Sequence, residues 1–289
     1  MSGQRSLPAY DAAAPTALAE TTPGPALAPP WRRAIRTHAL AIILPVAAAA
    51  FVLIVWEVLV RALKVPTIIL PSPSKIYETI VLVFPLLMEH SVQTTGESVL
   101  GVALATIFGL AIGAAIAYSP IFRAAIYPNM VFFQLIPKVA LAPLFIMWLG
   151  IGAESRLVFA VFIAFFPIAI SAATGLATVD ASYVRFCRGL TASDWQIFAN
   201  VRVPFALPSI FSGIKIGVTM SFIGVIVGEF ITSQSGLGYL ILFASARAET
   251  AVIFASITVL CMIGLAVYGA VVLLEILALR IWGAPYDAG

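Results

Sequence analysis

The chain has 289 residues, of which 62% are hydrophobic and only 10% are charged. Soluble domains carry about 25% charged residues, so this chain has too few charges to cover a surface that faces water. The composition therefore excludes a soluble enzyme, a disordered protein and a disulfide scaffold, and it indicates an all-α integral membrane protein. Its net charge of +3 is typical of the basic cytoplasmic loops of such proteins rather than of nucleic-acid binding.

The first 30 residues contain six prolines among many Ala, Ser and Thr residues. No apolar run precedes a small-residue cleavage site there, so the segment is not a signal peptide. We expect residues 1–36 to form a disordered cytoplasmic tail, which ends in a basic collar of Trp31, Arg32, Arg33 and Arg36. A transmembrane domain over residues 37–285 follows.

A bilayer core about 30 Å thick requires roughly 20 apolar residues of helix. Four segments meet this requirement, with Glu57 as their one charge: residues 39–60, 99–118, 157–177 and 250–274. Two further segments are weaker. Residues 119–154 are interrupted by Lys138 and by Pro128, Pro137 and Pro143. Residues 208–231 carry Lys215 near one end and Glu229 near the other. The pattern predicts six spans, with five as the alternative.

Six spans place both termini on one side of the membrane. If that side is the cytoplasm, ten basic residues lie inside and five outside, which agrees with the positive-inside rule. The inside set is Arg5, Arg32, Arg33, Arg36, Arg123, Arg185, Arg188, Arg202, Lys215 and Arg280, and the outside set is Arg61, Lys64, Lys75, Arg156 and Arg247. We therefore predict cytoplasmic termini in a bacterial-type inner membrane.

The first outside connection has the pattern of a helix start. Ser72 can cap a helix, and Pro73 suits its first position. We expect the helix that follows to run from Lys75 to His90 at the outer interface, with His90 in an outside loop.

The residues for catalysis or cofactor binding are missing from the sequence. It has no phosphate-binding loop and no metal-ligand spacing, and Cys187 and Cys261 form no pattern. We therefore predict no enzyme activity, no catalytic residue, no metal and no cofactor. Glu57, Glu229 and Glu275 lie near span ends and are interpreted as interfacial carboxylates, while Lys138 and Glu229 are our candidates for the transport pathway.

Three glycine pairs have the GxxxG spacing that lets helices approach closely in lipid. They are Gly109 and Gly113, Gly213 and Gly217, and Gly224 and Gly228. Packing within one chain and packing between two copies both fit this spacing.

The longest inside connection, residues 178–208, is polar but carries an apolar cluster. A turn at Gly189 can separate two short helices, and Thr191 or Ser193 can cap the second, with Asp194 in its first turn. Pro204 and Pro208 then end that helix and begin the next span. Apolar side chains at Trp195 and Phe198, outside the membrane, indicate a docking surface for a cytoplasmic partner. The alternative is that Trp195 lies at the lipid interface.

This connection resembles the EAA loop of binding-protein-dependent ABC transporter permeases, a pattern that reads Glu-Ala-Ala, three variable residues, Gly, and later Ile-x-Leu-Pro. Residues 201–204 match the last part and residues 190–196 resemble the middle. Arg185, Phe186 and Cys187 stand at the Glu-Ala-Ala positions, and Thr191 stands at the usual Gly.

Segments 70–73, 135–144, 148–152, 228–230 and 236–240 are similar to the nitrate, sulfonate, taurine and thiamine-precursor branch of that family, so that the resemblance covers residues 40–282. It implies a MetI-like permease fold and a homodimer in the bilayer. It also implies an ATPase subunit that supplies ATP hydrolysis and an extracytoplasmic substrate-binding protein.

The resemblance makes residues 190–200 the coupling helix, with Trp195 and Phe198 inserted into the ATPase. The coupling residues it implies are Arg185, Cys187, Gly189, Thr191, Asp194, Trp195, Phe198, Val201, Pro204 and Pro208. Because Arg185 reverses the charge of the usual Glu, we expect an acidic group opposite it on the ATPase.

The function expected is therefore the permease subunit of an ABC importer. Its substrate would be a small polar organic compound or oxyanion: a vitamin precursor of the pyrimidine or riboflavin type, or a sulfonate, taurine or nitrate. The alternatives are a stand-alone carrier driven by an ion or proton gradient and a membrane-bound enzyme.

Overall fold

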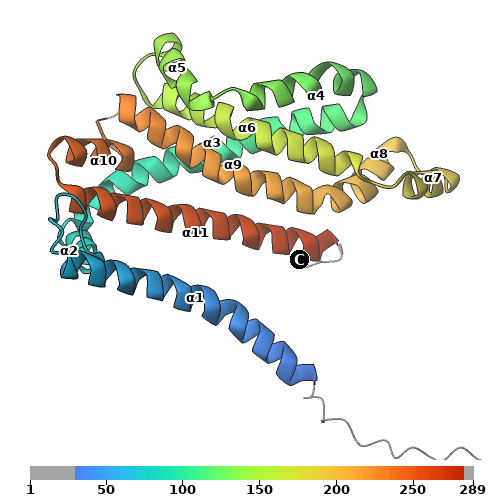
Figure 1. Ribbon diagram of the computed structural model, residues 1–289. Helices are drawn as coiled ribbons and strands as arrows, with labels where there is room; N and C mark the ends of the chain where they lie inside the picture. Colours follow the sequence, from blue (N-terminus) through green and yellow to red (C-terminus); the bar gives the residue numbers. More distant parts are fainter. Residues whose placement is uncertain (1–29, 233, 283–289) are drawn as a thin grey trace, which may run out of the picture. The chain divides into compact units, whose positions relative to one another are not determined.

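The computed structural model describes residues 30–232 and 234–282, with side chains from residue 43 onward (Figure 1). The expected tail at residues 1–29 and the end of the expected membrane domain at 283–285 lie outside the described residues. Residues 1–54 and 55–289 form two units. The second unit contains the last residues of the first helix and all of the helices after it.

Every regular element in the described residues is helical. The elements are α1 (Pro30–Ala62), α2 (Pro73–Leu82), α3 (Phe84–Tyr118), α4 (Pro120–Leu135), the 3-10 turn η1 (Lys138–Leu141), α5 (Ala142–Leu149), α6 (Ala153–Ala177), α7 (Ala181–Gly189), α8 (Asp194–Ile197), the π-turn η2 (Phe198–Arg202), α9 (Val203–Thr232), α10 (Leu237–Ala246) and α11 (Thr250–Trp282).

Five of the described helical segments are long and apolar enough to span a membrane, and α4 with α5 makes a sixth if that pair is one span. The pair is bent by 89° at a break that contains Pro137. This outcome confirms an all-α protein of about six spans, including the break expected between residues 119 and 154. Residues 30–36, which we assigned to the tail, are the first residues of α1.

The second span begins earlier than expected. α3 starts at Phe84 rather than at residue 99, because Val83 ends α2 and Pro85 suits the first turn of a new helix. The single interfacial helix expected from Lys75 to His90 is therefore wrong, and so is the placement of His90 in a loop. His90 instead lies in α3 and faces α10. Ser72 and Pro73 do start α2, as predicted.

Glu57 near the end of α1 fixes the start of α2. Its carboxylate accepts hydrogen bonds from the Ser74 backbone N–H at 3.0 Å and the Ser74 hydroxyl at 2.8 Å. It also pairs with Arg61 at 2.5 Å. A carboxylate at the amino end of a helix is favoured by the helix dipole, so Glu57 joins two neighbouring helices.

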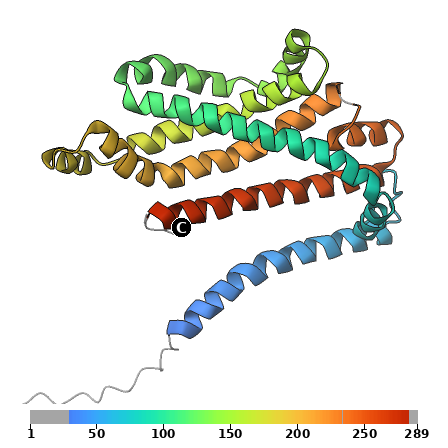
Figure 2. The same cartoon turned by 180° about the vertical axis from the view of Figure 1, so that it is seen from behind.

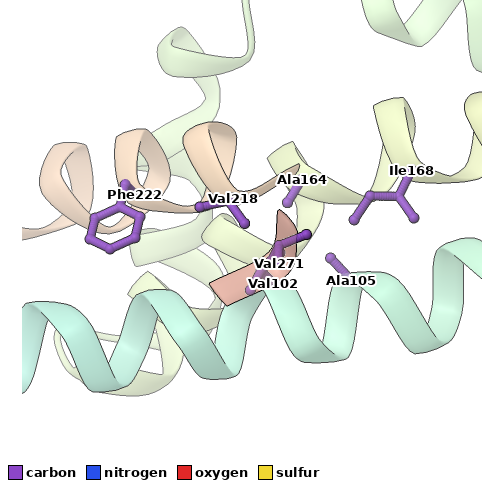
Figure 3. Packing of buried hydrophobic residues seen from close by; sticks show 7 residues of the cluster. All are labelled: Val102, Ala105, Ala164, Ile168, Val218, Phe222 and Val271. Carbon is purple, nitrogen blue, oxygen red and sulfur yellow. The ribbon is translucent and has the colours of Figure 1, made fainter. Parts of the chain in front are cut away.

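The core lies where α3, α6, α9 and α11 meet. One cluster shows its composition (Figure 3): Val102 and Ala105 of α3, Ala164 and Ile168 of α6, Val218 and Phe222 of α9, and Val271 of α11. The two alanines, Ala105 and Ala164, let the helix backbones approach closely there.

All three GxxxG pairs pack against α6 within the same chain. A Cβ atom added at Gly113 would lie 2.6 Å from the Cβ of Ala172, and one at Gly224 would lie 2.7 Å from the Cα of Ala160. At Gly213 it would lie 2.6 Å from the Cβ of Ser171. These faces are thus occupied inside one subunit, which decides between the two interpretations of the spacing.

Gly224→Ala should therefore lower the free energy of unfolding of the purified protein by about 1–3 kcal/mol, because the added methyl group meets backbone rather than a flexible side chain. The matched control is Gly264→Ala in α11, where the added Cβ has no neighbour within 4 Å. Alanine favours the helix there. Equal effects of the two changes in a denaturant titration would contradict this account of the packing.

Candidate functional site

The segment between α6 and α9 begins with a capped helix. Asp180 accepts a hydrogen bond from the Ser182 backbone N–H at 2.7 Å and another from its hydroxyl at 2.8 Å. The bond from the backbone N–H is the main reason that the pKa of Asp180 is lowered. Arg185 is exposed on this helix, α7.

The turn between α7 and α8 is made by Thr191 rather than by Gly189. Thr191 has φ +60°, whereas Gly189 is the last residue of α7. The Cys187 carbonyl accepts the Ala192 backbone N–H at 3.1 Å and so closes the turn. A β-branched residue with positive φ is strained, which explains why glycine is the residue that the family pattern has at this position.

A complete capping box begins α8. The Ser193 hydroxyl accepts the Gln196 backbone N–H at 3.2 Å, and the Gln196 side chain accepts the Ser193 backbone N–H at 2.8 Å. Of the two cap residues considered, Ser193 is therefore the correct one. Asp194 lies in the first turn and pairs with Arg188 at 3.2 Å, which holds the two short helices together.

The two aromatic residues of this segment have different environments. Trp195 is 72% exposed, and its ring stacks on Phe198 with 5.7 Å between centroids. Phe198 is half-buried and packs on a cluster formed by α6 and α9. Both rings border a hollow of about 350 Å³ that also contacts Tyr118 at the end of α3. Trp195 is thus the projecting side chain and Phe198 is the support beneath it.

Residues 190–200, the predicted coupling helix and hereafter the coupling segment, continue directly into α9. The π-turn Phe198–Arg202, which includes Val201, leads into α9 at Val203, and the whole stretch Asp194–Thr232 is one apolar helical run. Pro204 lies in the first turn of α9, where proline is tolerated. Pro208 lies inside the helix. The expectation that these prolines separate the coupling helix from the span is therefore wrong.

The opposite end of the bundle holds a buried ion pair that sequence analysis missed. Arg156 of α6 donates to both carboxylate oxygens of Glu97 of α3, at 2.5 and 2.9 Å. Both side chains are almost fully buried. Gln93 donates to the same carboxylate at 3.2 Å. Because no water is available in lipid, such charges persist only when they are paired.

The two pathway candidates lie in different surroundings. Lys138 is half-buried at the break between α4 and α5, where its ammonium donates to the Gln134 carbonyl at 3.0 Å. Its part in the pathway stays a prediction. Glu229 is only 1% exposed and is held by hydrogen bonds from α3 and α10, so its carboxylate is enclosed within the subunit.

The interfacial interpretation of Glu229 and Glu275 is wrong. Glu275 of α11 is buried and pairs with Lys215 of α9 at 2.6 Å. Neither Lys215 nor Arg156 lies in a connection, where we had counted them. The sequence signal for these ion pairs was a single charged residue inside an apolar run. Arg156 and Glu97 are 59 residues apart, and Lys215 and Glu275 are 60 residues apart, so only folding brings each pair together.

A protein-family comparison matches residues 105–283 to the family described as "binding-protein-dependent transport system inner membrane component". The match spans more than half of the chain. The chain belongs to this family. It is a multi-pass inner-membrane permease, and the function expected from the sequence, a permease subunit of an ABC importer, is confirmed.

Curated relatives support the assignment along most of this permease. It is 32% identical to a riboflavin transport system permease protein of Chloroflexus aurantiacus, over 92% of this chain and 100% of that one. It is 31% identical to a formylaminopyrimidine transport permease protein of Halalkalibacterium halodurans, over 77% and 89% of the two chains. The self-powered carrier gains no support from these comparisons.

A solved structure shows the same fold. A chain of the MetNI methionine ABC transporter, in an inward-facing conformation, superimposes with a TM-score of 0.59 at 18% identity. The match covers 68% of the permease and 97% of that chain. The expected MetI-like fold is therefore confirmed.

Replacing the strained residue of the turn should stabilise the permease. We expect Thr191→Gly to raise the free energy of unfolding by about 1 kcal/mol, because glycine adopts positive φ without strain. The control is the same change at Thr178, whose φ is −79° and where glycine should lower stability. Changes of the same sign at both positions, in unfolding followed by circular dichroism, would refute the strain at Thr191.

Breaking the buried ion pair should be costly. Arg156→Met should lower the free energy of unfolding by about 3–5 kcal/mol, because it leaves the Glu97 carboxylate buried and unpaired. Adding Glu97→Gln should recover a large part of that loss. Arg247→Met is the control, since Arg247 and Glu249 form an exposed pair whose loss costs less than about 1 kcal/mol. Additive effects of the Arg156 and Glu97 changes in a double-mutant cycle would argue against the pairing.

Proposed function

We propose that two copies of this permease, together with two ATPase subunits and an extracytoplasmic binding protein, import a small polar organic compound. The observation that carries the proposal is the projecting Trp195 on a capped helix that is continuous with α9. An exposed tryptophan on a rigid support is the kind of residue that dominates binding at protein interfaces. Family membership supports a separate ATPase as its partner.

The docking surface that we propose extends beyond Trp195. Phe186 of α7 and Leu190 after it are also exposed, and the turn at Thr191 and the Arg188–Asp194 pair hold α7 and α8 together. Arg185 lies on the same segment, and we propose an acidic partner group opposite it. Cys187, Gly189, Phe198, Val201, Pro204 and Pro208 would shape this surface rather than enter the ATPase.

We place the α7–α8 end of the bundle in the cytoplasm, and with it both chain termini. The basic residues of the connections support this orientation. In addition, α11 ends on the same side of the bundle as α7 and α8 (Figures 1 and 2).

For the substrate we propose a vitamin precursor of the pyrimidine or riboflavin type. The names of the relatives from Chloroflexus aurantiacus and Halalkalibacterium halodurans support this class. Thermal-shift screening of the cognate binding protein, with formylaminopyrimidine, riboflavin and taurine, tests it directly. Stabilisation by taurine alone would contradict the vitamin-precursor class and indicate a sulfonate as the substrate.

Trp195→Ala should weaken ATPase docking by about thirtyfold, the effect expected when an interface hot spot worth about 2 kcal/mol is truncated. Uptake in proteoliposomes should fall accordingly, while membrane insertion is retained. Trp148→Ala is the matched control, because Trp148 is 66% exposed in α5 and far from the coupling segment. Equal loss of ATPase binding in the two variants would overturn the proposed docking surface.

A further inference from the structure

The amino end of α10 is held by side chains of two other helices. Three successive backbone N–H groups at the start of α10 each donate to a side-chain acceptor. The bonds are Gly236 N–H to His90 Nδ1 at 2.9 Å, Leu237 N–H to Thr94 Oγ1 at 2.8 Å, and Gly238 N–H to Glu229 Oε2 at 2.7 Å. The first N–H groups of a helix have no partner within it, so α3 and α9 complete this helix end.

Thr94 and Glu229 act as one unit in this junction. The Thr94 hydroxyl donates to Glu229 Oε1 at 2.7 Å while it accepts the Leu237 N–H. Both side chains are fully buried. The carboxylate of Glu229 therefore faces the positive end of the α10 dipole and accepts from two donors, the Thr94 hydroxyl and the Gly238 N–H. The bond from Thr94 and the bond from Gly238 hold the carboxylate in one position, so loss of either weakens the other.

Two glycines make this approach possible. A Cβ atom at Gly238 would lie 2.8 Å from Glu229 Oε2. A Cβ atom at Gly236, which has φ +103°, would overlap the same carboxylate. Any larger residue at these positions would push the backbone away from Glu229. The sequence Gly-Leu-Gly is thus matched to a carboxylate on the preceding helix.

The helix that carries Glu229 also carries the coupling segment. The helical run Asp194–Thr232 extends from one end of the bundle to the other, and α10 lies at the end opposite α7 and α8 (Figure 1). Glycine contacts bind α9 tightly to α6. A displacement at Trp195 therefore reaches Glu229 along a helix with no intervening loop.

We propose that Glu229 is a positioning residue of the transport cycle: with Thr94 it locks α10 to α3 and α9, so that α10 moves with the coupling segment. This proposal rests on the proposed function, in which that segment docks on an ATPase. The Thr94–Glu229 junction, hereafter the lock, couples the ATPase-docking end and the α10 end in both directions, since linkage between two sites is reciprocal. A binding protein at the α10 end would thereby stimulate ATP hydrolysis at the other end.

Thr94→Val tests the lock against Thr94→Ser. Valine has the shape of threonine but no hydroxyl, so Glu229 Oε1 and the Leu237 N–H both lose their partner; serine keeps it. In the complete transporter, amide hydrogen exchange at residues 236–238 should accelerate about tenfold in Thr94→Val, the factor expected for one buried hydrogen bond to a charged group. Exchange in Thr94→Ser should match the parent protein, and unchanged exchange in Thr94→Val would overturn the lock.

The functional measurement compares ATP hydrolysis in nanodiscs with and without the binding protein loaded with formylaminopyrimidine. In Thr94→Val, the stimulation of ATP hydrolysis by the loaded binding protein should fall about tenfold, while the basal rate of hydrolysis is retained. In Thr94→Ser, the stimulation should equal that of the parent protein. Basal and stimulated rates that fall together would mean that the junction only stabilises the fold, which refutes the proposal. A normal stimulation in Thr94→Val despite faster exchange refutes it too.

A second variant covers the case in which Thr94→Val does not assemble. Glu229→Gln keeps the size of the side chain but presents an amide N–H₂ group to one of the two donors, so the same two measurements should change in the same direction. Absence of stimulation in the parent protein itself would count against the proposed function, whereas the exchange difference between valine and serine would still decide the lock.

Discussion

The close approach of α3 and α9 to α6 is the constraint on which the rest of the permease depends. Gly109 and Gly113 of α3 meet one side of α6, and Gly213, Gly217 and Gly224 of α9 meet another. Helices in lipid gain no hydrophobic energy from associating, so close packing contributes much of the attraction, together with hydrogen bonds between helices. The three helices therefore act as one body, and the remaining helices attach to it through fewer contacts.

Several polar groups of this bundle pair with one another across neighbouring helices. The Glu97–Arg156 pair joins α3 to α6, the Lys215–Glu275 pair joins α9 to α11, and the Ser221 hydroxyl bonds the Ser98 carbonyl at 2.8 Å between α9 and α3. An unpaired group at these positions would cost several kcal/mol, of the order of a lost hydrogen bond in an apolar medium. Polar pairing thus specifies which helix faces meet, while glycine packing specifies how closely.

The two ends of the bundle differ in the side chains that they expose and bury. At the α7–α8 end, short capped helices carry exposed apolar side chains, which suits a partner in water. At the other end, charged and hydroxyl side chains turn inward and hold α10. One helix, α9, joins both ends, because Pro204 falls in its first turn and the π-helical turn Phe198–Arg202 connects α8 to it without a break.

Much of the architecture could be predicted from local sequence. The apolar runs, the break near Pro137, the cap at Ser72 and the exposure of Trp195 depend on neighbouring residues, and the structure agrees with them. The start of α3 could not be predicted, because Glu89, His90 and Glu97 make its first turns polar and their burial or pairing is not visible locally. The turn at Thr191 was missed because a threonine with positive φ contradicts its own conformational preference.

By itself the sequence determined that this protein crosses a membrane in about six spans and that Trp195 is exposed near a capped helix start, since these follow from the length of apolar runs and from capping residues. Only the tertiary structure decided that Glu229 is enclosed by Thr94 and Gly238, that Lys215 meets Glu275, and that the glycine pairs face α6. Each of these depends on residues from different helices, and the periodicity of one helix shows where a side chain points but not what it meets.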